Sequence, residues 1–259
     1  MHLLMGLGLS SAFAQDAEPI TRSLPASAPE VRLLAGRGTV SIRHTPGLAS
    51  SQVTITPGRW YEACDISFSG DATAAIAEIT EAGERSPWRC TAHFDIELAG
   101  PTDVFVDMGR ARVDVDGAPG DLTVNLGRGR VTGRAERADV TISGTGRVAL
   151  WGLEEAARAS VGVGGVSLAY AQEIAGTIQA STRLGRVKVA LPYGSLIEDA
   201  TSTTVGLTRS AVPSREGHPT RLEASATVGR IRVDTDLSAL SASLEAAAPD
   251  QTTADSFGM

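Results

Sequence analysis

Apolar and polar residues alternate with a period of two along most of this chain, which is the pattern of β-strands with one buried face. The alternation uses β-branched and small residues rather than aromatic ones, which make up only 4% of the chain. In the first hundred residues it is clearest in four short segments, at 31–34, 39–43, 52–56 and 93–98. The pattern predicts an all-β fold.

From Met108 to Val233 the alternation becomes a repeat, in which a glycine and an arginine or second glycine precede alternating β-branched residues. Successive repeats are 18, 17, 18 and 21 residues apart when counted at Val113, Val131, Val148, Val166 and Val187. So short a period holds about two strands and two turns, and such a unit must bury its apolar face against its neighbours. We therefore expect a β-solenoid of stacked single-stranded coils over 99–236, preceded by a β region at 31–98.

Alternation also assigns side chains to faces: Arg112 and Asp114 point outward if Val113 and Val115 point inward. Glycines are expected at the turns between strands, where a Cβ is costly, at Gly109, Gly127, Gly144, Gly162 and Gly185. The rest of the expected core consists of Leu122, Val124, Leu126, Val140, Ile142, Val148, Leu150, Val161, Val163, Val166, Leu168, Val187, Val189, Leu191, Ile231 and Val233.

Two stretches break this rhythm. Residues between Cys64 and Cys90 include several alanines and glutamates, which fit either a short helix or a long hairpin connection. After Pro192 the repeat loosens: 204–207 resembles half a coil, and 211–220, with two prolines and a glycine, reads as a loop.

The two ends of the sequence predict export and a polar tail. Residues 1–14 form a short apolar run that ends in Ala12, Phe13 and Ala14, the small-x-small pattern cut by signal peptidase. The mature chain would begin with a flexible lead-in at 15–30, and 237–259 reads as a C-terminal tail. No later stretch reaches the roughly 20 apolar residues needed to span a membrane. We expect a location in the periplasm, outside the cell or at its surface.

The chain has two cysteines, Cys64 and Cys90. In an oxidising compartment such a pair is most simply a disulfide, worth about 3 kcal/mol in the chain-entropy model. The alternative is two separate buried thiols. The net charge of −7 argues against general nucleic-acid binding.

The motifs resemble those of the bacterial putative-adhesin family of β-strand-repeat proteins, a domain of unknown function. Residues 33–42 are similar to the opening motif of that family, and 93–106 to the segment that leads into its tandem repeats. The resemblance covers about 31–234. It implies an exported β-solenoid with a role in surface interaction or envelope sensing, and it supplies no catalytic residues.

The chain departs from the family in the residue just before the repeat valine, which the family pattern makes acidic or small and polar. Here that place is held by Arg112, Arg130, Arg147, Arg186 and Arg230, with Gly165 as the one break. Stacking turns these residues into an outward row of guanidinium groups, a candidate site for acidic glycans or lipid headgroups. Alternatively, the arginine stems cover apolar surface and keep it soluble, with Asp114, Asp116, Glu136 and Asp139 as partial neutralisers.

The sequence offers little catalytic chemistry. His44, His93 and His218 are widely separated and lack the spacing of metal ligands. The densest carboxylate group is at Asp103, Asp107, Asp114 and Asp116, which fits solvated strand residues better than a calcium or acid–base site. No catalytic residue, metal or cofactor is predicted.

These observations favour a non-enzymatic, adhesin-like interaction module whose partner is an unknown protein, acidic glycan or lipid of the envelope. The alternatives are a self-assembling envelope scaffold and a β-helical carbohydrate-active enzyme.

Overall fold

The computed structural model describes residues 18–24, 30–58, 64–70, 75–81, 90–118 and 120–235. The expected signal peptide at 1–14 and the tail at 237–259 lie outside these residues, as do 15–17 and 25–29 of the lead-in. In the described part of the chain, no helix is long and apolar enough to cross a membrane.

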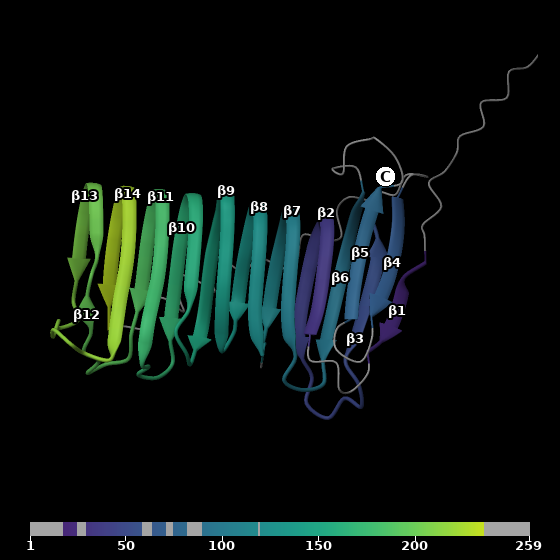
Figure 1. Cartoon of the computed structure of the whole chain (residues 1–259), viewed down its shortest axis with the longest axis horizontal. Coiled ribbons are helices and arrows are strands. Elements are labelled where there is room, and N and C mark those ends of the chain that lie inside the picture. The colour runs from purple at the N-terminus through teal and green to yellow at the C-terminus, as the bar shows by residue number, and fades with distance from the viewer. Residues whose placement is uncertain are drawn as a thin grey trace, which may run out of the picture.

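All elements of the described residues are β-strands that join in one open sheet, so the predicted all-β fold is confirmed (Figure 1). The six strands of the N-terminal part are β1 (Ile20–Ser23), β2 (Glu30–His44), β3 (Gln52–Pro57), β4 (Cys64–Gly70), β5 (Ala75–Glu81) and β6 (Thr91–Leu98). The strands of the repeats are β7 (Asp103–Asp116), β8 (Asp121–Arg134), β9 (Arg137–Leu153), β10 (Arg158–Tyr170), β11 (Gly176–Ala190), β12 (Glu198–Asp199), β13 (Ser202–Ser210) and β14 (Thr220–Asp234).

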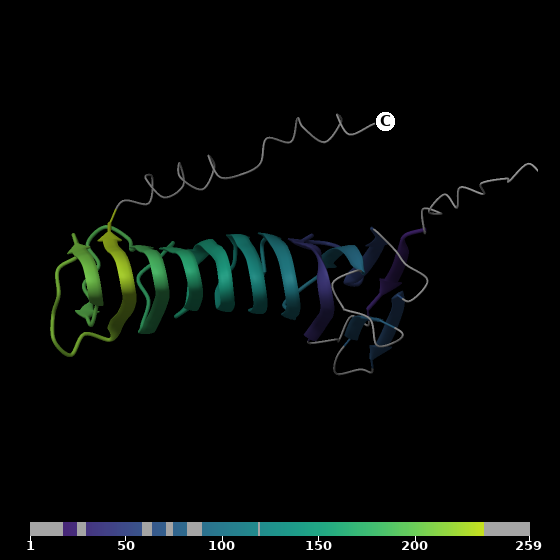
Figure 2. The ribbon, with the colours of Figure 1, turned by 90° about the horizontal axis from the view of Figure 1, so that it is seen from above.

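The strands from β2 to β14 stack in parallel in the order β2-β7-β8-β9-β10-β11-β14 (Figures 1 and 2). On the N-terminal side, β6 pairs with β2, and the antiparallel strands β3 and β1 complete the edge. In the described part of the stretch between the two cysteines, β4 and β5 pair antiparallel, as in the hairpin alternative, and β5 also pairs with β2.

Each repeat strand must bend back on itself. A straight strand of the 14 residues of β7 would be about 46 Å long, whereas residues 117–120, which connect it to β8, reach only about 13 Å. Burial shows where the bend falls: Val104, Val106 and Met108 are buried, and then Ala111, Val113 and Val115. The alternation therefore shifts by one residue at 109–110, and both halves of the strand turn apolar side chains inward.

The bend recurs at the same register position in every coil. A row that we call the corner glycines lies there, with alanine replacing glycine in β7: Gly38, Ala111, Gly129, Gly146, Gly164, Gly185, Gly229 and Gly206. Gly185 has a φ of 151°, and a Cβ on it would lie 1.6 Å from the carbonyl oxygen of Gly164. Of the five expected turn glycines only Gly185 is a corner glycine, because the corner falls two residues later than Gly109, Gly127, Gly144 and Gly162.

The core lies between the two halves of the bent strands. Every residue of the expected core is buried except Val163, which is 39% exposed. The prediction for Val163 was wrong because simple alternation from Val161 does not hold next to the corner at Gly164.

The C-terminal end of the stack departs from chain order. β14 inserts between β11 and β13, so β13 lies outside a strand that follows it in sequence. The expected half coil at 204–207 lies within β13, and 211–219 is the loop that leads to β14.

Cys90 is buried beside β6 and is not a free thiol. The side chain of Cys64 lies outside the described side chains, so the Cys64–Cys90 disulfide stays a prediction.

Candidate functional site: an arginine ladder and its cleft

The five predicted arginines occupy one register position of the stacked sheet. Arg112 pairs with Arg130 and Arg130 with Arg147. After the break at Gly165, the row continues through Arg186 to Arg230. Each lies immediately after a corner glycine or its alanine replacement, and we call the row the arginine ladder. Sequence alternation predicted this row because the residue before an inward valine must face outward.

The N-terminal half of the ladder is partly covered. The Nε of Arg112 donates to Asp114 at 2.7 Å, and the Nε of Arg130 donates to the Thr132 hydroxyl at 2.7 Å. Burial lowers the pKa of Arg130, and the positive charges of Arg147 and Arg112 lower it further, whereas Asp114 opposes the shift. The ladder therefore places like charges close enough to act on one another.

The C-terminal half is more open. Arg147, Arg186 and Arg230 are exposed, and none of them forms an ion pair with another described residue. Of the four carboxylates expected to neutralise the ladder, Asp114 does so, whereas Asp139 pairs with Arg158 at 3.5 Å, away from the ladder. Asp116 and Glu136 form no ion pair with the ladder within the described ranges.

A cleft of about 600 Å³ lies at the N-terminal end of the ladder, between the first repeat strands and β6. Four arginines are among the residues that line it, two from the ladder and two from the residues before the corner: Arg112, Arg130, Arg37 and Arg110. Arg37 and Arg110 pair across β2 and β7 and are exposed. The cleft therefore combines a concave shape with four positive charges, which suits an anionic group.

His93 forms part of the wall of this cleft. Its Nε2 lies 3.1 Å from the carboxylate of Asp95, and its Nδ1 contacts the hydroxyl of Thr39 on the neighbouring strand. If the Nε2–H donates to Asp95, the Nδ1 accepts from Thr39. Both ring nitrogens are then engaged within the protein, so His93 is held as a wall residue and not as a base directed at a ligand.

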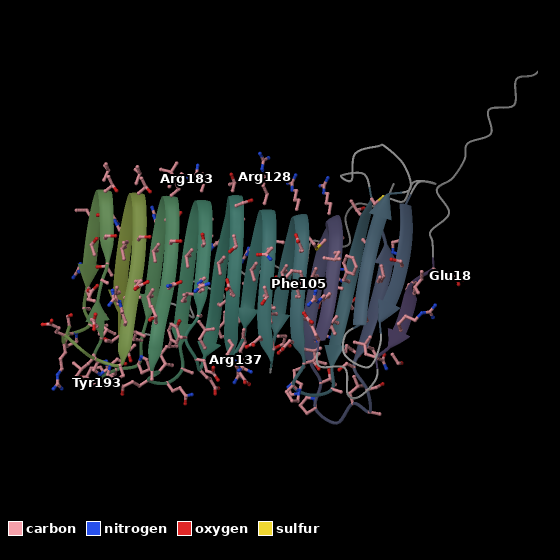
Figure 3. The ribbon with its side chains drawn as sticks, viewed as in Figure 1. Glu18, Phe105, Arg128, Arg137, Arg183 and Tyr193 are labelled. Carbon is pink, nitrogen blue, oxygen red and sulfur yellow. The ribbon has the colours of Figure 1, made fainter. Side chains whose placement is uncertain are left out.

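Sequence reasoning missed the arginines on the other side of the corner, Arg37, Arg110 and Arg128. Arg128 lies at the upper edge of the stack with Arg183 (Figure 3). The signal was the Arg-x-Arg pattern at 110–112 and 128–130, of which only the second arginine was assigned a role. Because the strand bends at the intervening residue, the two arginines of each pair project from the same corner.

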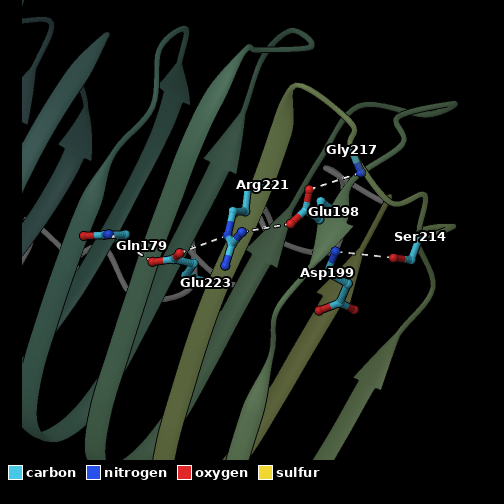
Figure 4. Close-up of polar contacts among 7 residues, drawn as sticks. All are labelled: Gln179, Glu198, Asp199, Ser214, Gly217, Arg221 and Glu223. Atoms are coloured by element: carbon cyan, nitrogen blue, oxygen red, sulfur yellow. Dashed lines mark hydrogen bonds and ion pairs between the residues drawn. The ribbon is translucent and has the colours of Figure 1, made fainter.

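Three arginines on the opposite edge, Arg137, Arg158 and Arg221, form ion pairs. Arg137 lies there (Figure 3), 2.8 Å from Asp121. Further along, Arg221 contacts Glu198 at 2.8 Å and Glu223 at 3.0 Å, and Glu223 also accepts from Gln179 at 3.0 Å (Figure 4). These arginines take part in a network that ties adjacent coils together, in contrast to the open half of the ladder.

The other candidate residues of the sequence are not brought together. His218 lies 3.9 Å from Glu173, and Asp103 accepts from the backbone N–H of Asp121 at 2.8 Å. Among the described residues, no cluster of histidine, cysteine, aspartate or glutamate has a geometry suited to a metal ion.

No family model and no curated protein matches the sequence. Among solved structures, a putative cell adhesion protein from Clostridium sporogenes is 14% identical, with a TM-score of 0.42, over 84% of this chain and 98% of its own. A putative adhesin from Parabacteroides distasonis is 9% identical, with a TM-score of 0.40 and the same coverage. A putative lipid binding protein from P. distasonis is 9% identical, with a TM-score of 0.31, over 84% of this chain and 97% of its own.

Proposed function

We propose that this protein is a non-enzymatic interaction module of the cell envelope or surface that binds acidic polymers through the arginine ladder and its cleft. The observation that carries the proposal is the shared register of guanidinium groups, of which Arg147, Arg186 and Arg230 form no ion pair with another described residue. Like charges near 4 Å repel by about 1 kcal/mol even in water. A bound polyanion removes that repulsion and gains charge-assisted hydrogen bonds.

The ladder suits a repeating ligand. Neighbouring strands of a sheet are about 4.8 Å apart, so successive guanidinium groups meet carboxylate, sulfate or phosphate groups spaced along one polymer. The cleft concentrates positive charge, because Arg37, Arg110, Arg112 and Arg130 are among the residues that line it. We assign it the role of anchoring one acidic group while the ladder guides the rest.

The proposal includes the finer features that the sequence predicts. The bent, stacked strands are taken as the coils of a β-solenoid, and export through the signal peptide at 1–14 brings the chain to the envelope. In that oxidising compartment Cys64 and Cys90 form a disulfide, and thiol titration of the denatured, unreduced chain is expected to find no free thiol.

Retention on polygalacturonate and on a sulfated polysaccharide, at low and moderate salt, tests the proposed function. The double variant Arg130→Ser/Arg147→Ser should bind about tenfold more weakly, because it loses two solvent-accessible ion pairs with the ligand, each worth about 0.7 kcal/mol. Binding of the unmodified protein should weaken with salt, since exposed charges are screened.

The matched control is Arg158→Ser/Arg221→Ser, which removes the same charge from the paired network on the opposite edge. It should retain binding within about twofold, because those groups already face carboxylates. If the two double variants lose binding equally, the loss reflects only the change in net charge, and a site at the ladder is contradicted. Unchanged retention of Arg130→Ser/Arg147→Ser would remove the proposal.

One observation favours the scaffold as a second candidate. β13 pairs only with β14 among the described strands, and its exposed face includes Val205 and Leu207. Such an edge can accept a strand from another copy. Light scattering that rises with protein concentration would favour the scaffold, whereas a constant monomer mass favours the binding module.

A further inference from the structure

The residues that precede the corner glycines form a second row, which we call the corner row. On the N-terminal coils it is charged, with Arg37, Arg110 and Arg128. After Thr145 it becomes apolar, and the residues pair directly from strand to strand: Val163, Leu184, Val228 and Val205. One edge of the sheet therefore changes from basic to apolar along the stack.

The apolar part of this edge is open to solvent. Its four residues, together with Leu207 after the last corner glycine, are between 39% and 65% exposed. With adjacent strands about 4.8 Å apart, the four rungs extend for about 14 Å. We call Val163, Leu184, Val228, Val205 and Leu207 the apolar corner. A contiguous row of half-exposed aliphatic side chains marks an interaction surface more often than scattered ones do.

Positive charge surrounds the apolar corner. Arg183 and Arg186 flank it on β11, Arg230 on β14 and Arg209 on β13. All four are exposed, and none forms an ion pair with another described residue. Arg183 lies at the upper edge of the stack in Figure 3, as Arg128 does.

Acidic residues are missing from these bend segments. The chain contains 30 aspartates and glutamates and has a net charge of −7, yet none of the acidic residues lies in 141–150, 160–168, 182–189, 203–210 or 226–233. The corner of the C-terminal coils is therefore a basic and apolar strip on an acidic protein. Two copies brought together at this strip would place guanidinium groups against one another, which disfavours a second copy as the occupant.

We infer that the apolar corner docks onto a lipid bilayer that contains anionic headgroups. Arg183, Arg186, Arg230 and Arg209 contact the lipid phosphates, while the aliphatic side chains enter the boundary between headgroups and acyl chains. Apolar burial and attraction to anionic lipid are the two contributions that hold interfacial proteins at membranes. The inference rests on the proposed function, because it names a lipid surface as an anionic partner of the same edge.

Co-sedimentation of the full chain with vesicles tests the inference. The vesicles contain either phosphatidylcholine alone or phosphatidylcholine with about a third phosphatidylglycerol, the composition that supplies the surface charge. The unmodified protein should partition onto the anionic vesicles and not onto the neutral ones. The double variant Leu184→Ser/Val228→Ser should partition about tenfold more weakly, the expected effect of losing two partly buried aliphatic groups.

Two control variants separate this inference from the proposed function. Tyr193→Ser removes a 94% exposed aromatic side chain at the opposite edge (Figure 3), and it should keep full partitioning. Leu184→Ser/Val228→Ser should bind soluble polygalacturonate as the unmodified protein does, whereas Arg130→Ser/Arg147→Ser should bind it about tenfold more weakly. Because Leu184 and Val228 are about half exposed, their replacement should leave the thermal unfolding transition in place.

Several results would overturn the inference. Normal partitioning of Leu184→Ser/Val228→Ser would remove the apolar corner from lipid binding. Retention of soluble polygalacturonate without any vesicle binding would reject the lipid surface and leave the proposed function standing. If the unmodified protein binds neither polygalacturonate nor anionic vesicles, both the proposed function and the lipid inference are rejected. A dimer that dissociates in Leu184→Ser/Val228→Ser would assign the apolar corner to self-association.

Discussion

Arginines occur on both edges of the stacked sheet, and some of those on the ladder edge lack the neighbouring carboxylates that hold Arg137, Arg158 and Arg221 on the opposite edge. Arg221 is held between Glu198 and Glu223, whereas Arg147 and Arg186 face outward with no ion pair to a described residue. An exposed ion pair contributes about 0–1 kcal/mol to folding. We therefore expect substitution of the paired arginines to leave binding intact, whereas the unpaired arginines keep their hydrogen-bond donors for a ligand.

Glycine at the corner is a requirement of packing between coils. For Gly185→Ala we expect a loss of about 2–3 kcal/mol in the free energy of unfolding, because the new Cβ overlaps the Gly164 carbonyl oxygen in a strained left-handed backbone. Gly165→Ala is the matched control, since its nearest contact would be at 3.6 Å. It should change stability by less than about 0.5 kcal/mol. Urea denaturation measures both values, and equal stability of the two variants would contradict the packing requirement.

Within a single element, the corner decides which alternate residues are buried. β10 runs through Gly164, so Val161 and Val166 point inward although the number of residues between them breaks the alternation. The same shift leaves Val163 at the surface. A strand of this fold is thus two half-strands joined by a glycine, each with its own phase.

Substitution on either side of the corner should reveal the phase shift. Val161→Ala removes methyl groups from a side chain that is 2% exposed, and it should cost about 1–3 kcal/mol. Val163→Ala, two residues away, should cost less than about 0.5 kcal/mol because that side chain already meets water. Thermal unfolding of the two variants compares their stabilities directly. If Val163→Ala is the less stable of the two, the bend does not lie at Gly164.

Sequence reasoning predicted the parts of the fold that depend on alternation alone. It identified the strands of the repeats, nearly the whole inward face, and the arginine ladder, since these follow from a period of two. It missed Arg37, Arg110 and Arg128 because their position depends on the bend, which alternation does not locate. Sequence reasoning also missed the cleft, because the cleft depends on the pairing of β6 with β2, whose partner residues are more than fifty positions apart in the sequence.

At the scale of the whole molecule, each coil contacts only its neighbours, so stability is distributed along the stack. β8, β9 and β10 have paired strands on both sides, whereas β13 pairs only with β14 among the described strands. We expect backbone amides of 202–210 to exchange with solvent at least tenfold faster than those of 137–153. Hydrogen exchange followed by mass spectrometry measures this gradient, and uniform protection from β8 to β13 would indicate a single cooperative unit instead.

Folding of this chain cannot simply follow the order in which its strands are made. β13 leaves the ribosome before β14, yet in the finished sheet β14 lies between β11 and β13. For β14 to pair with β11 directly, the edge of β11 must still be unpaired when residue 234 has been synthesised, although Val205 and Gly206 offer it the same corner pattern as Val228 and Gly229. In a nascent chain that stalls before Thr220, β13 can pair with β11 at the position that β14 occupies in the finished sheet. Completion of the sheet is then limited by exchange of one strand for another, and not by the rate of elongation.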